Sequence, residues 1–153
     1  MYVVVVLLQT LVLPLISSVV HLIVAPGSSI LIVLGTWWGF WGVGTRLLLA
    51  GLSQLTNPAR TSKGILGIDD ANAEQVVHEL GFANLSFGVV AVATSLIPEW
   101  GLLGAVPGAI YLGLAGVRHV GKRGKNAEEQ VATWTDLLVF VLVGLGVVGL
   151  LIR

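Results

Sequence analysis

A few polar and charged residues lie inside long apolar stretches of this sequence, and they are the side chains that could bind a ligand. Arg46 lies about two turns inside the end of one stretch, and Glu79 and Asn84 lie near the start of another. An arginine near the centre of a bilayer costs about 2.5–3.5 kcal/mol even on a lenient scale. Arg46 therefore either extends to the lipid headgroups or faces other helices and pairs with a carboxylate, for which Glu79 is the natural partner.

Further polar residues are expected at the same membrane depth. Tyr111 and His119 share one face of the following apolar stretch, and Asp136 begins the last one. Asp136 follows Thr133 at the spacing of a capping box, so helix capping could account for it. The candidate ligand-binding residues, expected around a polar pocket that opens to the cytoplasm, are Arg46, Glu79, Asn84, Tyr111 and His119.

Catalytic and metal-binding patterns are missing from the sequence. It contains no Ser-His-Asp order, phosphate-binding loop or HExxH motif, so no catalytic residue and no enzyme activity is predicted. Three dispersed histidines and the lack of cysteine predict neither a metal site nor a cofactor. Trp37, Trp38 and Trp41 could stack on a flat ligand such as a quinone, although packing against neighbouring helices is the favoured interpretation.

Composition indicates the environment of these residues. Of the 153 residues, 56% are hydrophobic and only 10% are charged, whereas soluble domains carry about 25% charged residues. The lipid bilayer is therefore the expected partner of most of the surface. The net charge is zero, which gives no indication of a nucleic-acid partner. The sequence predicts an all-α bundle of membrane helices.

The apolar stretches predict a single transmembrane domain over residues 1–153 with about five helices, at 2–24, 30–52, 76–97, 102–120 and 130–152. Turn residues separate them, as in Ala25-Pro26-Gly27. Asn126 and Glu129 have the spacing of a capping box and predict a helix start.

The distribution of Lys and Arg predicts the orientation of these helices. With five helices and a cytoplasmic N-terminus, seven of the eight basic residues fall on or near the cytoplasmic side and only Arg153 falls outside. The opposite orientation would reverse this bias. A multi-pass protein of the cell membrane with its N-terminus inside is therefore expected.

Small residues recur along one face of several predicted helices. Gly35 and Gly39 form one small-xxx-small pair, and Gly104 and Gly108 form another. Such pairs let membrane helices approach closely, so packing is the favoured interpretation. The alternative is that the glycines make room for a ligand.

The run from Glu79 to Gly88, ELGFANLSFG, resembles a family of small bacterial multi-pass membrane proteins of unknown function that carries an E-x-G-F-A-N-L-x-F-G signature. Gly108, Tyr111, Gly113 and His119 match the Gly- and Tyr-containing helix that follows in that family, where a Gly usually stands at the position of Arg118. The resemblance covers about residue 52 to the C-terminus and is distantly similar to DoxX-like four-helix proteins, to which the first helix is additional. It implies a helical membrane fold and no reaction.

Three functions remain open at this point. The first is the binding or transport of a small molecule through the cytoplasm-facing polar pocket. The second is a structural or accessory subunit that joins a larger membrane complex, or a homo-oligomer, through its glycine faces. The third is a component of a quinone-linked membrane oxidoreductase, which rests on the tryptophan cluster and the DoxX-like similarity.

Overall fold

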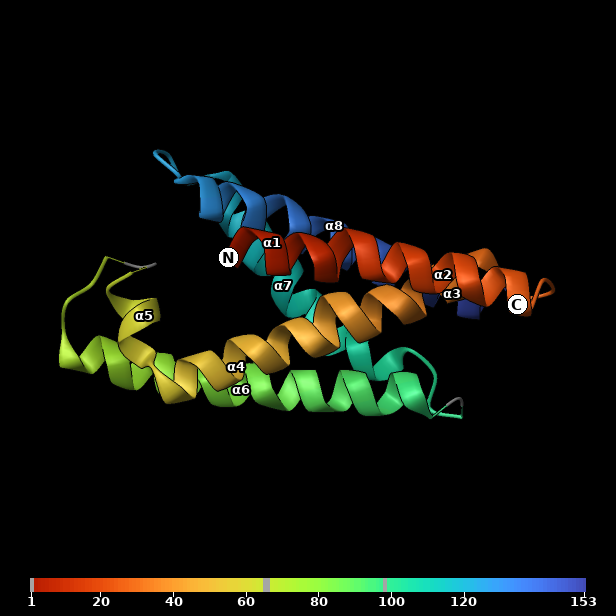
Figure 1. The fold of residues 1–153 in the computed structure, drawn as a ribbon, viewed down its shortest axis with the longest axis horizontal. Helices are drawn as coiled ribbons and strands as arrows, with labels where there is room; N and C mark the ends of the chain where they lie inside the picture. Colours follow the sequence, from red (N-terminus) through yellow and green to blue (C-terminus); the bar gives the residue numbers. More distant parts are fainter. Residues whose placement is uncertain (1, 65–66, 98) are drawn as a thin grey trace.

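The computed structural model describes residues 2–64, 67–97 and 99–153, and within these ranges the protein contains helices and no strands (Figure 1). The first helix consists of α1 (Tyr2–Leu7), the π-helical segment η1 (Leu8–Val12) and α2 (Leu13–Val24). The second helix, unbroken over residues 30–56, consists of α3 (Ile30–Trp37), the π-helical segment η2 (Trp38–Thr45) and α4 (Arg46–Thr56). The remaining elements are α5 (Pro58–Ser62), α6 (Ala71–Leu96), η3 (Leu103–Ala105), α7 (Val106–Val120) and α8 (Ala127–Leu151).

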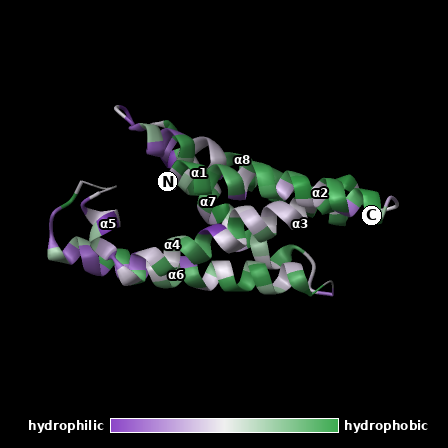
Figure 2. Cartoon of the chain, in the orientation of Figure 1, coloured by the Kyte–Doolittle hydropathy of each residue, from purple (hydrophilic) through white to green (hydrophobic). Residues whose placement is uncertain are grey.

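Among the described residues, four helices are long and apolar enough to cross a membrane: Tyr2–Val24, Ala71–Leu96, Leu103–Val120 and Ala127–Leu151. Their outer faces leave large apolar side chains exposed, including Ile23 (73%), Leu114 (68%) and Leu151 (80%), and Figure 2 shows apolar residues along these helices. A soluble protein would bury such faces, whereas lipid covers them without cost. The prediction of an all-α bundle of the membrane type is confirmed.

Each of the five predicted ranges overlaps a helix, and polar first turns account for the two helices that start earlier than predicted. The range predicted at 76–97 begins at Ala71 in the structure, where the Asp70 side chain accepts a hydrogen bond from Asn72 N at 2.8 Å. The range predicted at 130–152 begins at Ala127, after the capping box of Asn126 and Glu129. That capping box was predicted and is confirmed.

The helices form two arms that share a middle section (Figure 1). In one arm α4 packs along α6, and in the other α8 packs against α3 and α7, with the first helix alongside. The second helix joins the arms, because α3 belongs to one and α4 to the other. The residues at the η2–α4 junction therefore lie where the arms diverge.

Close contacts between glycines hold both arms together. A Cβ atom built on Gly35 would lie 2.6 Å from Cα of Gly146, which shows that the backbones of α3 and α8 touch. A Cβ on Gly88 would lie 2.6 Å from Leu48 N, and one on Gly51 would lie 2.8 Å from Leu85 N, so α4 and α6 touch in the same way. Membrane helices gain van der Waals contact from such approach. The packing interpretation of the glycine faces is confirmed at these positions.

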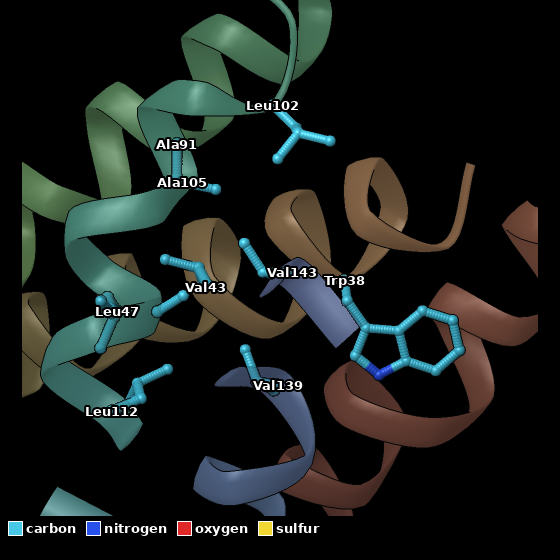
Figure 3. Packing of buried hydrophobic residues seen from close by; sticks show 10 residues of the cluster. Trp38, Val43, Leu47, Ala91, Leu102, Ala105, Leu112, Val139 and Val143 are labelled. Carbon is cyan, nitrogen blue, oxygen red and sulfur yellow. The ribbon is translucent and has the colours of Figure 1, made fainter. Parts of the chain in front are cut away.

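A cluster of apolar side chains fills the shared middle section (Figure 3). Val43 and Leu47 come from the second helix, Leu112 from α7, and Val139 and Val143 from α8, and each is at most 5% exposed. This cluster positions the residues next to it in the chain, because Arg46 precedes Leu47 and Asp136 lies one turn before Val139.

Candidate functional site

A buried ion pair joins the second helix to α8 next to the apolar cluster. Nη2 of Arg46 lies 2.5 Å from Oδ1 of Asp136, and the two residues are only 8% and 4% exposed. Arg46 therefore faces the helices and does not extend to the headgroups. Gly42 lies one turn before Arg46 on the same helix and packs against Val139 of α8. The Arg46 side chain therefore points toward α8 as well.

The predicted pairing of Arg46 with Glu79 is wrong. Glu79 is exposed on α6. The face of α6 that meets α4 is marked by Gly81, and Glu79 lies two residues earlier, which is about 200° around the helix axis. Glu79 therefore points away from the second helix and takes no part in the candidate site.

Asp136 is also not a helix cap. The helix that contains it begins at Ala127, so Asp136 lies between two and three turns inside α8. The signal for this was present in the sequence, because a helix that starts after Asn126 cannot have its cap ten residues later. A helix that starts at the Asn126–Glu129 capping box carries Asp136 on its inner turns, where the carboxylate can pair with Arg46.

The ion pair leaves hydrogen-bonding capacity unused. Nη1 of Arg46 is buried and has no hydrogen-bond partner among the described residues, whereas Oδ1 of Asp136 is in contact with Nη2 of the same guanidinium. Buried polar atoms in proteins nearly always have a partner, so the unpaired Nη1 indicates a place where an acceptor group can bind.

Two of the other candidate residues lie close to the pair. Tyr111 and His119 lie on α7, which packs against α8 beside Asp136, since a Cβ built on Gly116 of α7 would lie 3.3 Å from Cβ of Asp136. Tyr111 also packs against Phe87, with 5.7 Å between the ring centroids. The shared site of Arg46, Tyr111 and His119 stays a prediction, and Asp136 takes the place beside Arg46 that was expected for Glu79.

Asn84 belongs to a different contact. Its Nδ2 donates a hydrogen bond to Oε1 of Gln54 at 2.8 Å, and both side chains are buried between α4 and α6. Gln54 was not among the candidate residues. A local signal existed, since Gly51 precedes Gln54 by three residues, just as Gly81 precedes Asn84. In each helix the polar residue thus follows a close-contact glycine on the same face.

The three tryptophans attach the first helix to the second. Nε1 of Trp38 donates to the carbonyl oxygen of Thr10 at 2.9 Å, inside the π-helical segment η1. Trp41 donates to Ser17 Oγ at 3.0 Å and Trp37 donates to a ring nitrogen of His21 at 3.3 Å. The favoured interpretation of the tryptophans as packing residues agrees with these bonds.

No protein family, curated protein or solved structure matches this chain. The resemblance to small bacterial membrane proteins with the E-x-G-F-A-N-L-x-F-G signature therefore stays a prediction. A functional proposal has to rest on the geometry of the residues described above.

Two apolar grooves flank the first helix. The larger, of about 440 Å³, lies between the first and second helices, and the smaller, of about 260 Å³, lies between the first helix and α8. Neither groove is lined by Arg46, Glu79, Asn84, Tyr111 or His119, so the predicted polar pocket is not one of these two. In the described part of the chain, no group of three or more His, Asp or Glu residues could hold a metal ion.

Proposed function

We propose that this protein binds or transports a small molecule at the Arg46–Asp136 ion pair. The observation that carries the proposal is that Arg46 Nη1 is buried without a hydrogen-bond partner among the described residues, beside the pair that Nη2 forms with Asp136. A guanidinium nitrogen is a donor. A ligand with an acceptor oxygen, such as an amide or a carboxylic acid, would satisfy it.

The energetics of buried charges support a functional role for the pair. Two charges removed from water lose solvation that their mutual attraction does not always repay, and apolar residues of similar volume are often equally stable. Ionisable residues inside a membrane commonly serve ligand binding or transport for this reason. His119, at the end of α7, would line the approach to the pair from the basic side of the protein.

The proposal includes a topology of five membrane crossings with the N-terminus in the cytoplasm, in the cell membrane. The second helix would be the fifth crossing; its middle is rich in Gly and Trp and it carries Arg46. Successive long helices run in alternating directions (Figure 1), which is the arrangement that consecutive crossings require. The α5 region and the loop at 121–126 lie at the same end, and both carry basic residues.

Cysteine labelling tests this topology, since the sequence contains no native cysteine. In intact cells a membrane-impermeant maleimide should label Gly27→Cys and Glu99→Cys, and should label Lys63→Cys and Arg123→Cys only after permeabilisation. Each of these four positions lies in a connection between long helices or at its edge. The reverse pattern would refute the orientation, and labelling of Gly27→Cys together with Lys63→Cys would refute a crossing by the second helix.

Ligand binding is tested by thermal melting of the purified protein in detergent, against a panel of small primary amides and carboxylic acids. A bound compound should raise the melting temperature with increasing concentration. The rise should vanish in Arg46→Leu/Asp136→Leu and persist in Lys63→Gln/Asp69→Asn, which removes an exposed ion pair instead. Failure of every compound to stabilise the protein, or an unchanged rise in the Leu/Leu variant, would argue against the proposal.

The two other functions lose the features that motivated them. The close-contact glycines of α3, α4, α6 and α8 meet partners inside the protein, so they offer no free face to a larger complex. The N–H groups of the three tryptophans donate to the first helix, so these bonds account for the cluster by attachment of one helix to another, and Trp41 also lines the larger groove. The accessory-subunit and quinone hypotheses therefore rank below ligand binding at the ion pair.

A further inference from the structure

The smaller apolar groove, between the first helix and α8, ends near a basic loop. Its lining consists of Leu7, Leu11, Gln130, Val131, Trp134, Thr135 and Leu138. Gln130 lies about 6 Å along the axis of α8 from Asn126, the residue that caps this helix. Trp134, one turn further, is 60% exposed although its ring is large and apolar. The groove thus runs from the start of α8 into the apolar part of the protein.

The basic loop consists of Lys122, Arg123, Gly124 and Lys125, directly before α8. Lys122 forms an ion pair with Glu129, and Nζ of Lys125 donates to the carbonyl oxygen of His119 at 2.8 Å. Arg123 is exposed and forms no ion pair within the described part of the chain. Three cations therefore lie five to eight residues before Gln130 in the chain, and among the described residues only Lys122 is paired with an acid.

We propose that this groove and the basic loop together bind an anionic phospholipid. One acyl chain would lie in the groove against Leu7, Leu11 and Leu138, and the phosphate would lie at Arg123 and Lys125. The charge of the loop complements a phosphate, and clusters of Lys and Arg beside a membrane helix attract anionic lipids. Trp134 lines the groove about two turns from the start of α8, and indole rings are enriched where membrane helices meet the headgroups.

The larger groove does not offer the same combination. Its lining is Val5, Leu8, Gln9, Leu13, Trp41, Thr45, Leu48, Leu49 and Leu52, and none of these residues is charged. An acyl chain there would have no headgroup partner among the lining residues, so that groove would not select one lipid over another. The phospholipid site rests on the smaller groove and the basic loop alone, and does not depend on ligand binding at Arg46 and Asp136.

The test uses quenching of Trp134 fluorescence by lipids with brominated acyl chains. The full-length protein is placed in phosphatidylcholine vesicles that contain increasing fractions of brominated phosphatidylglycerol or brominated phosphatidylcholine. The difference in emission between the wild type and Trp134→Phe isolates the signal of this residue. Half-maximal quenching should need at least a fivefold lower fraction of the brominated phosphatidylglycerol.

Two paired variants decide the role of the loop. Arg123→Gln/Lys125→Gln keeps N–H donors but removes two charges, and should abolish the preference, because each cation near a headgroup contributes about a fivefold factor. Arg60→Gln/Lys63→Gln removes two charges on the α5 side and should leave the preference unchanged. Equal quenching by the two lipids would show ordinary contact with bulk lipid. A preference that survives in the first variant, or disappears equally in both, would overturn the site.

Discussion

Replacing Asp136 with leucine should lower the free energy of unfolding by about 3–5 kcal/mol, because the change leaves the Arg46 guanidinium buried without a counter-charge. Arg46 is 8% exposed and its contact with Asp136 is its only ion pair within the described residues. The side chain begins on the inner face of the second helix, so it cannot reach the headgroups without moving the helix. Arg46→Leu should cause a loss of similar size by isolating the carboxylate.

The double variant Arg46→Leu/Asp136→Leu should recover most of the lost stability, since apolar residues replace both charges. The four proteins form a double-mutant cycle that denaturant unfolding in detergent can measure.

Lys63→Gln is the matched control at an exposed pair. The hydrogen bond and the charge of Asp69 raise the pKa of Lys63, yet both side chains are in contact with water, so no change in unfolding is expected. If the double variant lost as much stability as the two single variants together, Arg46 and Asp136 would not be directly paired.

Gly88→Ala should destabilise the protein by about 1–3 kcal/mol, the range for overpacking a close contact. The added Cβ would lie 2.6 Å from Leu48 N and 2.9 Å from the carbonyl oxygen of Gly44. Both atoms belong to the backbone of the second helix, so no side-chain rotation relieves the clash. The α4 and α6 helices would have to separate, which would also stretch the hydrogen bond between Asn84 and Gln54.

Gly144→Ala is the matched control for this substitution. Gly144 lies inside α8 with nothing within 4 Å of an added Cβ, so the same methyl group should raise helix stability slightly, by up to about 1 kcal/mol. The two variants therefore change stability in opposite directions. Thermal melting of both in the same detergent checks the prediction, and a neutral Gly88→Ala would mean that α4 and α6 are not in backbone contact.

Local pattern was enough to predict the helices and one of their caps. A stretch of about 20 apolar residues can satisfy its backbone hydrogen bonds in lipid only as a helix, and this requirement depends on no other part of the chain. The capping box of Asn126 and Glu129 is equally local, since both partners lie within one turn. The glycine faces also follow from spacing along one helix.

The partner of Arg46 could not be predicted from local sequence pattern. Spacing placed Arg46 on the inner face of the second helix, but its partner depends on which helix lies opposite and how that helix is rotated. Glu79 and Asp136 are both single acids near the start of an apolar stretch, and packing distinguishes them. The α6 face that meets α4 is set by Gly81 and Gly88, which turns Glu79 outward. The contact of Gly42 with Val139 brings Asp136 to Arg46.

Membrane insertion, helix positions and the Asn126 cap thus follow from the residues in order along the chain, because each depends on hydrogen bonds or solvation within a single segment. The Arg46–Asp136 pair, the contact of Asn84 with Gln54 and the attachment of the first helix by Trp38 join segments that are far apart in the chain. Their partners are chosen by backbone approach at glycines and by side-chain packing. These forces act between helices, so they operate only once the helices have assembled.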